Sequence, residues 1–152
     1  MNPRTTGLAA TGVSVRYGTT IAVDDVTLRL APGDRVAVVG ASGSGKSSVL
    51  RALLALRAPD AGTVTLDGRP VRPGSARRLR PFRRDVQFVP QDPGASLDPR
   101  STVAAAVSAP LRWLDVPTDR RARIREAVES VGLERSILTA RLDRLSGGQK
   151  QR

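Results

Sequence analysis

Apolar and polar residues alternate through the first part of the chain, a pattern typical of half-buried strands. The alternation predicts one strand over 13–17 and a second over 21–30, with a turn at 18–20 between them. Residues 1–12 are interpreted as a frayed lead-in, and Ala-Pro-Gly-Asp at 31–34 as another turn. The chain therefore opens with a hairpin and not with the strand–helix–strand unit of a parallel sheet.

A short apolar strand is predicted over 35–39, and a glycine- and serine-rich loop follows it. From 48 to 56 the apolar residues form a wide stripe at helical spacing, so this segment is predicted to be a helix. Asp67-Gly68 stands between two strand-like runs, 63–66 and 69–71, which is a strong signal for a two-residue hairpin turn.

The region from 72 to 85 is rich in arginine and is interpreted as a loop or a short helix. Residues 86–89 form an apolar run that stops at Pro90, and this pattern predicts a short buried strand. A proline-rich loop over 92–99 comes next. Beyond that loop the pattern changes from strands to helices.

The last third of the chain is predicted to be helical. Apolar residues keep helical spacing from 103 to 114, although Pro110 is expected to kink or break that run. Pro117-Thr118-Asp119 is a cap-like start for a second helix, and Gly132 is its expected end. After a short turn, Leu-Ser-Gly-Gly-Gln at 145–149 opens another helix.

The composition limits the chemistry that the chain can perform. It contains no cysteine and no histidine, which excludes a disulfide framework, a thiolate metal site and a histidine general base. No apolar run reaches the ~18 residues of a membrane span, so the expected location is cytoplasmic. The net charge is +11, which would suit a nucleic-acid partner. However, the arginines are scattered and aromatic residues are few. The favoured explanation of the charge is therefore a GC-rich genome that encodes arginine in place of lysine.

The glycine-rich loop fits the pattern G-x-x-x-x-G-K-S/T of nucleoside-triphosphate phosphate loops. It reads Gly40-Ala41-Ser42-Gly43-Ser44-Gly45-Lys46-Ser47, between a predicted strand and a predicted helix. Its glycines let the backbone wrap a phosphate chain and turn N–H groups inward. Lys46 is expected to reach the β- and γ-phosphates, Ser47 to ligate Mg²⁺, and Ser48 to add a phosphate hydrogen bond. An unliganded turn is disfavoured, because one of only two lysines stands in the lysine position of the motif.

Three further features are ambiguous by themselves. Ser146-Gly147-Gly148 places a hydroxyl and two glycines at a helix start, which is either an anion site or an ordinary glycine-rich cap. Tyr17 is an isolated aromatic before the phosphate loop, either a platform for a nucleobase or a residue of a sheet surface. The run Ile21-Ala22-Val23-Asp24-Asp25 has the form of a magnesium-binding strand end. Because it precedes the phosphate loop, an exposed acidic turn is the favoured interpretation.

Residues 40–47, Gln91 and 145–149 together resemble the Walker A loop, Q-loop and LSGGQ signature of an ABC-transporter ATPase subunit. The resemblance covers almost the whole chain and matches Tyr17 to the family's A-loop aromatic, which stacks on the base. The stretch from 89 to 100 resembles the oligopeptide and nickel importers more than other branches of the family.

The resemblance implies an α/β fold of the P-loop NTPase type, in which antiparallel hairpins and a phosphate-loop core precede a helical subdomain. The β-rich and phosphate-loop core would span 12–91 and the helical subdomain 92–144. The signature and the start of the next helix would occupy 145–152.

The resemblance also implies a mechanism and partners. Two such domains would pair head to tail, as a homodimer or heterodimer, with each ATP between the phosphate loop of one subunit and Ser146-Gly147-Gly148-Gln149 of the other. Lys46 and Gln91 would act in catalysis, and Gln91 would contact Mg²⁺ and the attacking water. The subunit would couple ATP hydrolysis to import of peptides or nickel. Permease subunits would hold it at the inner face of the cell membrane.

The sequence departs from the family pattern after the signature. Family members have a further strand that ends in an acidic pair, followed by a switch histidine, and these 152 residues contain neither. We therefore expect a fragment or truncated product that binds ATP without turning it over by itself. The alternative function is a soluble ABC-type ATPase that acts on nucleic acid or another cytosolic complex. A phosphate-loop kinase or GTPase is disfavoured, because neither explains the signature.

Overall fold

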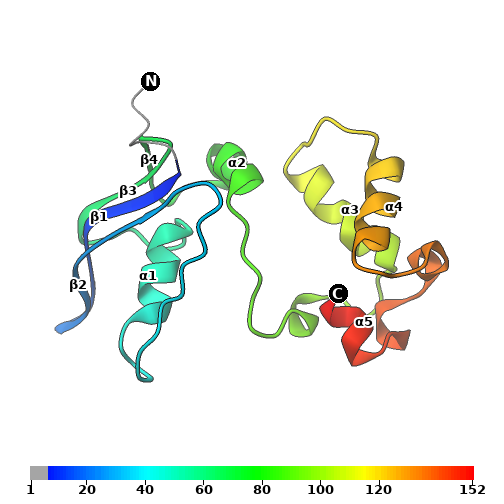
Figure 1. Ribbon diagram of the computed structural model, residues 1–152, viewed down its shortest axis with the longest axis horizontal. Coiled ribbons are helices and arrows are strands. Elements are labelled where there is room, and N and C mark those ends of the chain that lie inside the picture. Colours follow the sequence, from blue (N-terminus) through cyan, green and yellow to red (C-terminus); the bar gives the residue numbers. More distant parts are fainter. Residues whose placement is uncertain (1–6) are drawn as a thin grey trace. The chain divides into compact units, whose positions relative to one another are not determined.

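The computed structural model describes residues 7–152, and the chain forms two compact units, one ending at Gln87 and the other beginning at Phe88. Each unit is described by itself. The first contains a β-sheet with two helices, α1 and α2, and the second contains the helices from α3 onward (Figure 1). The functional division expected after Gln91 stays a prediction.

The sheet of the first unit begins with the predicted hairpin. Strand β1 (Leu8–Tyr17) pairs antiparallel with β2 (Thr20–Leu30), and Tyr17 is the register partner of Thr20 beside the turn. The expected lead-in over 1–12 is wrong for its described part, since β1 begins at Leu8. Residues 8–10 pair with strands on both sides, which outweighs their weak alternation.

A second hairpin completes the sheet. Strands β3 (Ala61–Leu66) and β4 (Arg69–Val71) pair antiparallel, and the strand order is β2-β1-β3-β4. Asp67 and Gly68 both have positive φ, +49° and +76°, as a two-residue hairpin turn requires. This predicted turn is confirmed.

Helix α1 (Lys46–Leu53) packs on the sheet and supplies much of the first core. The cluster of buried residues is drawn from α1 and three strands and consists of Ala10, Val13, Val15, Val23, Val49, Ala52, Leu53 and Val64. The helix begins two residues earlier and ends three residues earlier than the apolar stripe predicted. It ends there because Ala55 has a left-handed φ of +52°.

The arginine-rich segment forms a helix, α2 (Ala76–Asp85). Of its two interpretations, a loop or a short helix, the short helix is confirmed. The Ser75 side chain caps its start by accepting a hydrogen bond from the Arg78 N–H. Leu79 and Phe82 are buried, and a second small core forms where they pack beside Ala55. The helix therefore turns its apolar side inward and leaves its arginines at or near the surface.

Two predicted strands are wrong. Residues 35–39 have no regular secondary structure, and Val36, Val38 and Val39 are exposed. Residues 86–89 are likewise irregular, with Phe88 and Val89 exposed. A strand needs a neighbour that satisfies its N–H and C=O groups. Within the described part of the chain, no other segment pairs with either run.

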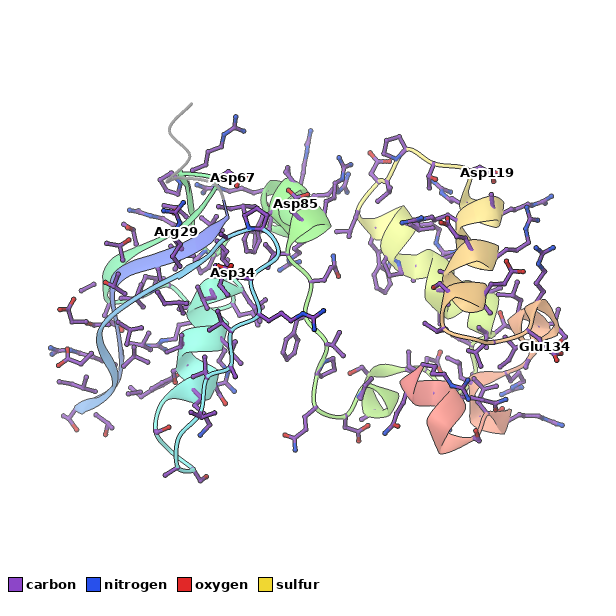
Figure 2. The ribbon with its side chains drawn as sticks, viewed as in Figure 1. Arg29, Asp34, Asp67, Asp85, Asp119 and Glu134 are labelled. Atoms are coloured by element: carbon purple, nitrogen blue, oxygen red, sulfur yellow. The ribbon has the colours of Figure 1, made fainter. Side chains whose placement is uncertain are left out.

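The second unit is built on two helices. Helix α3 (Val103–Trp113) begins at a Thr102 cap, and α4 (Arg120–Ser130) begins at Asp119, whose carboxylate accepts from two N–H groups of the first turn (Figure 2). The predicted cap at 117–119 is confirmed, and so is the end of α4 near Gly132, which has a φ of +71°. Short helical turns follow at η3 (Arg135–Thr139) and η4 (Leu142–Arg144), then α5 (Gly147–Gln151).

Of the kink or break expected at Pro110, the break is wrong, because α3 continues through it to Trp113, and the kink stays a prediction. A proline removes one helical hydrogen bond. The following turn is still closed, since the Leu114 N–H donates to the Pro110 carbonyl at 2.9 Å. The core of this unit packs α3 against α4 and η4 through Val103, Val128 and Leu142. None of the described helices is long and apolar enough to cross a membrane.

Candidate functional site

The loop over 40–45 leads directly into α1. The loop and the helix expected of the motif are therefore present, but the strand expected before the loop, over 35–39, is not. No side chain caps the start of α1, and its first turn contains no acidic residue. The N–H groups and the positive end of the helix dipole therefore meet the loop without a competing carboxylate. Such an end can hold a phosphate.

Gly45 connects the loop to the sheet. Its φ is +87°, and a Cβ atom added there would lie 2.1 Å from the Ala22 carbonyl oxygen of β2. Glycine is therefore required for two reasons, the left-handed backbone and the closeness of β2. This contact fixes where the first turn of α1 begins.

The Lys46 side chain lies over its own loop. Its Nζ atom donates hydrogen bonds to the carbonyl oxygens of Gly40 at 2.8 Å and Ala41 at 2.6 Å, and lies 3.4 Å from the Ser44 hydroxyl. The ammonium is thus held against the backbone of the glycine-rich turn. This is the part of the loop where the motif is expected to hold phosphates.

Tyr17, at the end of β1, lies beside the start of α1. The Ser48 hydroxyl donates to the Tyr17 hydroxyl at 3.4 Å, and Ser48 is buried while Tyr17 is 39% exposed. The hydrogen bond from Ser48 and the nearby Arg51 and Arg57 guanidiniums lower the pKa of Tyr17. The structure therefore brings the predicted stacking residue next to the predicted phosphate loop, within one unit.

Arg57, which follows α1, is a neighbour of the candidate site that the sequence did not predict. Its guanidinium carbon lies 4.3 Å from the centroid of the Tyr17 ring. The two residues are far apart in the chain, and no short motif contains both. Only the fold, which brings the end of β1 against the turn after α1, shows that they meet.

The other predicted site residues belong to the second unit. Gln91 lies in an exposed bend. The Ser146 hydroxyl caps α5 by accepting from the Gln149 N–H at 3.2 Å, and the Gln149 side chain accepts from the Ser146 N–H at 2.9 Å. A Cβ atom added at Gly147 or Gly148 would meet nothing within 4 Å.

The open surroundings of Gly147 and Gly148 distinguish them from Gly45. Neither has a positive φ, and neither is crowded by the chain. The described part of the chain, residues 7–152, therefore does not explain why glycine stands at these two positions. A close approach by another molecule would explain it.

Ser47, one of the two residues expected to bind Mg²⁺, can supply one ligand of the metal ion. Ser47 is exposed at the start of α1 and offers one hydroxyl oxygen, the kind of ligand that Mg²⁺ prefers. Among residues 7–152 no group of three or more acidic side chains could hold a metal alone. Nucleotide phosphates and water would have to complete the coordination, as is usual for Mg²⁺.

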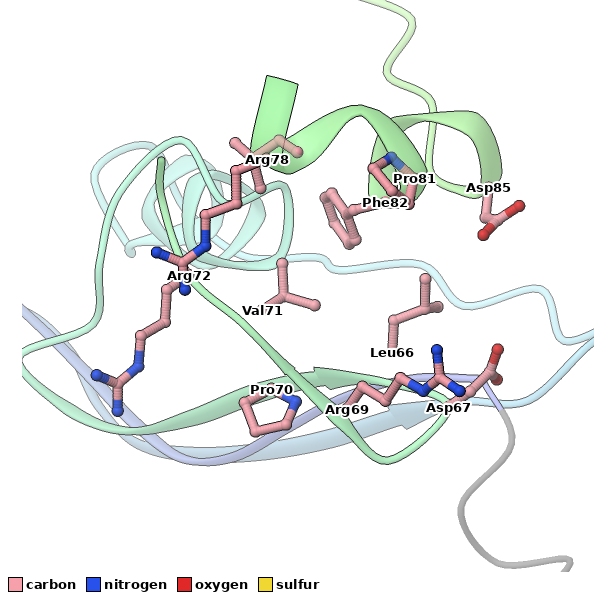
Figure 3. Close-up of a pocket in the computed structure, with 11 residues that line it drawn as sticks. Leu66, Asp67, Arg69, Pro70, Val71, Arg72, Arg78, Pro81, Phe82 and Asp85 are labelled. Carbon is pink, nitrogen blue, oxygen red and sulfur yellow. The ribbon is translucent and has the colours of Figure 1, made fainter. Parts of the chain in front are cut away.

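A crevice of about 490 Å³ lies elsewhere in the first unit, between the β3–β4 hairpin and α2 (Figure 3). Its lining is apolar at the centre, where Leu66 and Val71 of the hairpin face Phe82 of α2, and it also includes Arg69 and Arg72. None of the predicted site residues lines it. The phosphate loop, and not this crevice, is therefore the candidate site.

Comparison with known proteins identifies the family. The family model described as ABC transporter matches residues 23–152, so the chain belongs to this family. A protein of Brucella abortus, named provisionally as a peptide import ATP-binding protein, is 42% identical over 134 residues, which are 86% of this chain and 40% of that protein. A Brucella ovis protein with the same provisional name is 38% identical, over 95% of this chain and 48% of its own length. The chain thus spans less than half of these relatives.

Solved structures agree with the fold. A dimeric ATP-binding cassette in a post-hydrolysis state, bound to ADP and Pi, is 30% identical with a TM-score of 0.75, covering 95% of this chain and 65% of its own. A protein from Clostridium perfringens, described as part of an ABC transporter complex, has a TM-score of 0.80 at 23% identity, covering 96% of this chain and 58% of its own. The predicted α/β fold of the ABC ATPase type is confirmed, with an antiparallel sheet in the first unit.

Proposed function

We propose that this chain is the ATP-binding, energy-coupling subunit of an ABC importer for peptides. The observation that carries the proposal is the position of Lys46, whose ammonium lies over the glycine-rich loop at the uncapped start of α1. The provisional names of the Brucella relatives support the peptide class.

The proposal gives each residue of the first unit a task. The loop over 40–45 and the N-terminal turn of α1 hold the triphosphate, with Lys46 balancing its charge and Ser48 adding a hydrogen bond. Tyr17 stacks on the adenine. Mg²⁺, bound with the nucleotide, neutralises charge on the phosphates, and Ser47 supplies one of its ligands from this unit.

The second unit takes part through a partner. Ser146, Gly147, Gly148 and Gln149 contact the ATP held by a second ABC subunit, in a head-to-tail pair. The dimeric state of the solved cassette and the open space around both glycines support this arrangement. ATP hydrolysis takes place in that pair, and permease subunits hold the pair at the inner face of the membrane.

The experiment is an uptake assay in the source organism, with its own gene replaced by Lys46→Ala or by Lys150→Ala. Lys150 is the only other lysine and lies outside the phosphate loop. We expect Lys46→Ala to abolish uptake of a labelled oligopeptide and Lys150→Ala to retain most of it. Unchanged peptide uptake in Lys46→Ala, or a loss confined to nickel uptake, would overturn the peptide assignment.

A binding measurement on the purified protein tests the alternative class. If the protein acts on nucleic acid, purified protein should bind duplex DNA with an affinity that falls steeply with salt, because bound phosphates release counterions. The importer account expects no such binding at 150 mM salt, which is roughly physiological ionic strength.

A further inference from the structure

One face of the Tyr17 ring is in contact with a cation. The Arg57 guanidinium carbon lies 4.3 Å from the ring centroid, well within the ~6 Å range of a cation–π contact. Tyr17 is nevertheless 39% exposed. Arg57 therefore covers part of the ring and leaves other ring surface open to solvent.

Arg57 is held in this position by two other groups. Its Nη2 atom donates to the Arg16 carbonyl oxygen and lies 3.5 Å from the Asp60 carboxylate. The same carboxylate oxygen of Asp60 accepts from the Arg16 N–H at 2.7 Å. The guanidinium is thus tied to the end of β1, next to the residue that it covers, and its orientation is fixed by hydrogen bonds and not by the ring alone.

The Tyr17 ring is also held at its hydroxyl end. Ser48, which is buried in the first turn of α1, donates to the Tyr17 hydroxyl at 3.4 Å. Ser48 directly follows the two motif residues Lys46 and Ser47. The ring is therefore fixed on one face by Arg57 and at its edge by the helix that begins at the phosphate loop.

We propose that Arg57 is a positioning residue for nucleotide binding, which holds the Tyr17 ring so that its free surface accepts the nucleobase. The base, the Tyr17 ring and the guanidinium would then form a three-layer stack. This inference rests on the proposed ATP binding. In this inference Arg57 contributes, through Tyr17, to the part of the ATP affinity that depends on the base. The part that depends on the phosphates comes from the loop.

The contact between Arg57 and the Tyr17 ring also has an opposite interpretation, and the test must distinguish the two. If Arg57 occupied the ring face that the base requires, ATP would have to displace it, and removing Arg57 would strengthen ATP binding. The two interpretations predict changes of opposite sign in the same measurement.

The test measures dissociation constants for Mg²⁺-ATP and for Mg²⁺-tripolyphosphate by calorimetry on the purified protein. Four forms are compared: the parent, Arg57→Ala, Arg57→Lys and Arg123→Ala. Arg123 is the matched control, because it forms an ion pair with Glu126 three residues on, as Arg57 does with Asp60, but lies in the second unit.

For the parent we expect ATP to bind more tightly than tripolyphosphate. Arg57→Ala should reduce the ratio of the ATP affinity to the tripolyphosphate affinity about fivefold, which corresponds to one moderate cation–π contact. It should not change tripolyphosphate binding. Arg57→Lys should restore much of the ratio, and Arg123→Ala should leave it unchanged. An unchanged ratio in Arg57→Ala, or tighter ATP binding, would overturn the inference. If the parent bound neither ligand, the proposed function would fail and this inference with it.

A spectroscopic measurement checks that Arg57 acts through the ring. Tyr17 is the only tyrosine in the chain, so the near-ultraviolet titration of phenolate reports on this residue alone. The hydrogen bond from Ser48 lowers the pKa of Tyr17 most, Arg51 lowers it next, and Arg57 has the smallest effect of the three. Arg57→Ala should raise that pKa slightly and Arg123→Ala should not. A lowered pKa in Arg57→Ala, or the same change in Arg123→Ala, would contradict the proposal.

Discussion

The Nζ atom of Lys46 lies 2.6 Å from the carbonyl oxygen of Ala41, the second residue of the glycine-rich loop. A carbonyl is a neutral acceptor, and a phosphate oxygen is a charged one, so the ammonium binds the phosphate more strongly. Binding of a nucleotide would therefore exchange these carbonyl acceptors of Lys46 for phosphate oxygens.

Tyr17 should matter for the base and not for the phosphates. Tyr17→Ala should weaken Mg²⁺-ATP about tenfold, within the range of one lost base stack, and should leave Mg²⁺-tripolyphosphate unchanged. Tyr17→Phe keeps the ring and loses only the hydroxyl, which contacts Ser48 at 3.4 Å and interacts with Arg51, so it should bind ATP nearly as the parent does. Equal losses for ATP and tripolyphosphate in Tyr17→Ala would assign the residue to the fold instead.

Gly45 should be essential for stability, and Gly33 provides a matched control. Both have φ near +87°, but an added Cβ at Gly45 would lie 2.1 Å from the Ala22 carbonyl oxygen, whereas at Gly33 it would meet nothing within 4 Å. We expect Gly33→Ala to cost ~1–2 kcal/mol of unfolding free energy and Gly45→Ala more than ~3 kcal/mol. Urea unfolding followed by circular dichroism measures both. Equal costs would show that the closeness to β2 is not a constraint.

The stability of the first unit should depend on pH through Asp60. The N–H of Arg16, which donates to the Asp60 carboxylate, lowers the pKa of Asp60, with further help from Arg57. A carboxyl whose folded pKa is lowered stabilises the fold at pH values above its ordinary pKa of ~3.9 and loses that effect as pH falls through the folded value. Asp60→Asn should therefore be less stable than the parent at pH 7.

The pH test compares unfolding free energies of the parent and Asp60→Asn between pH 7 and pH 2. The difference between the two proteins should be largest at neutral pH and should shrink in acid, where both side chains are uncharged. A difference that stayed constant with pH would mean that charge on Asp60 contributes nothing, and that the substitution acts only through packing.

Local signals in the sequence predicted local structure well. The Asp67-Gly68 turn and the Asp119 cap each depend on a few adjacent residues, and both are confirmed. The strand over 35–39 was predicted from its valines but is irregular, because pairing partners and not composition decide whether a strand forms. Arg57 could not have been predicted as part of the site, since its contacts with Arg16 and Tyr17 exist only in the folded chain.

The signature glycines should affect pairing and not folding. Because Gly148 lies in open space in the first turn of α5, Gly148→Ala should leave the unfolding free energy the same or raise it by up to ~1 kcal/mol. The same substitution should weaken ATP-driven dimerisation at least about tenfold, as expected for a lost close contact. Sedimentation with a non-hydrolysable ATP analogue measures the dimer.

Ser146 serves as the comparison for Gly148. Ser146→Ala removes the helix cap, so it should reduce stability by ~1 kcal/mol and weaken the dimer as well. If Gly148→Ala dimerised as well as the parent, the signature segment would not form part of a shared ATP site.

The most direct test of the central claim is the affinity of the protein for Mg²⁺-ATP, measured by calorimetry on the parent, Lys46→Ala and Lys150→Ala. Charge-assisted hydrogen bonds contribute ~1.5–3 kcal/mol, so Lys46→Ala should weaken binding roughly ten- to hundredfold. Lys150→Ala removes the same charge from α5 and should bind as the parent does. Equal affinities for the parent and a correctly folded Lys46→Ala would contradict the account, because the phosphate loop would then not be the site where ATP binds.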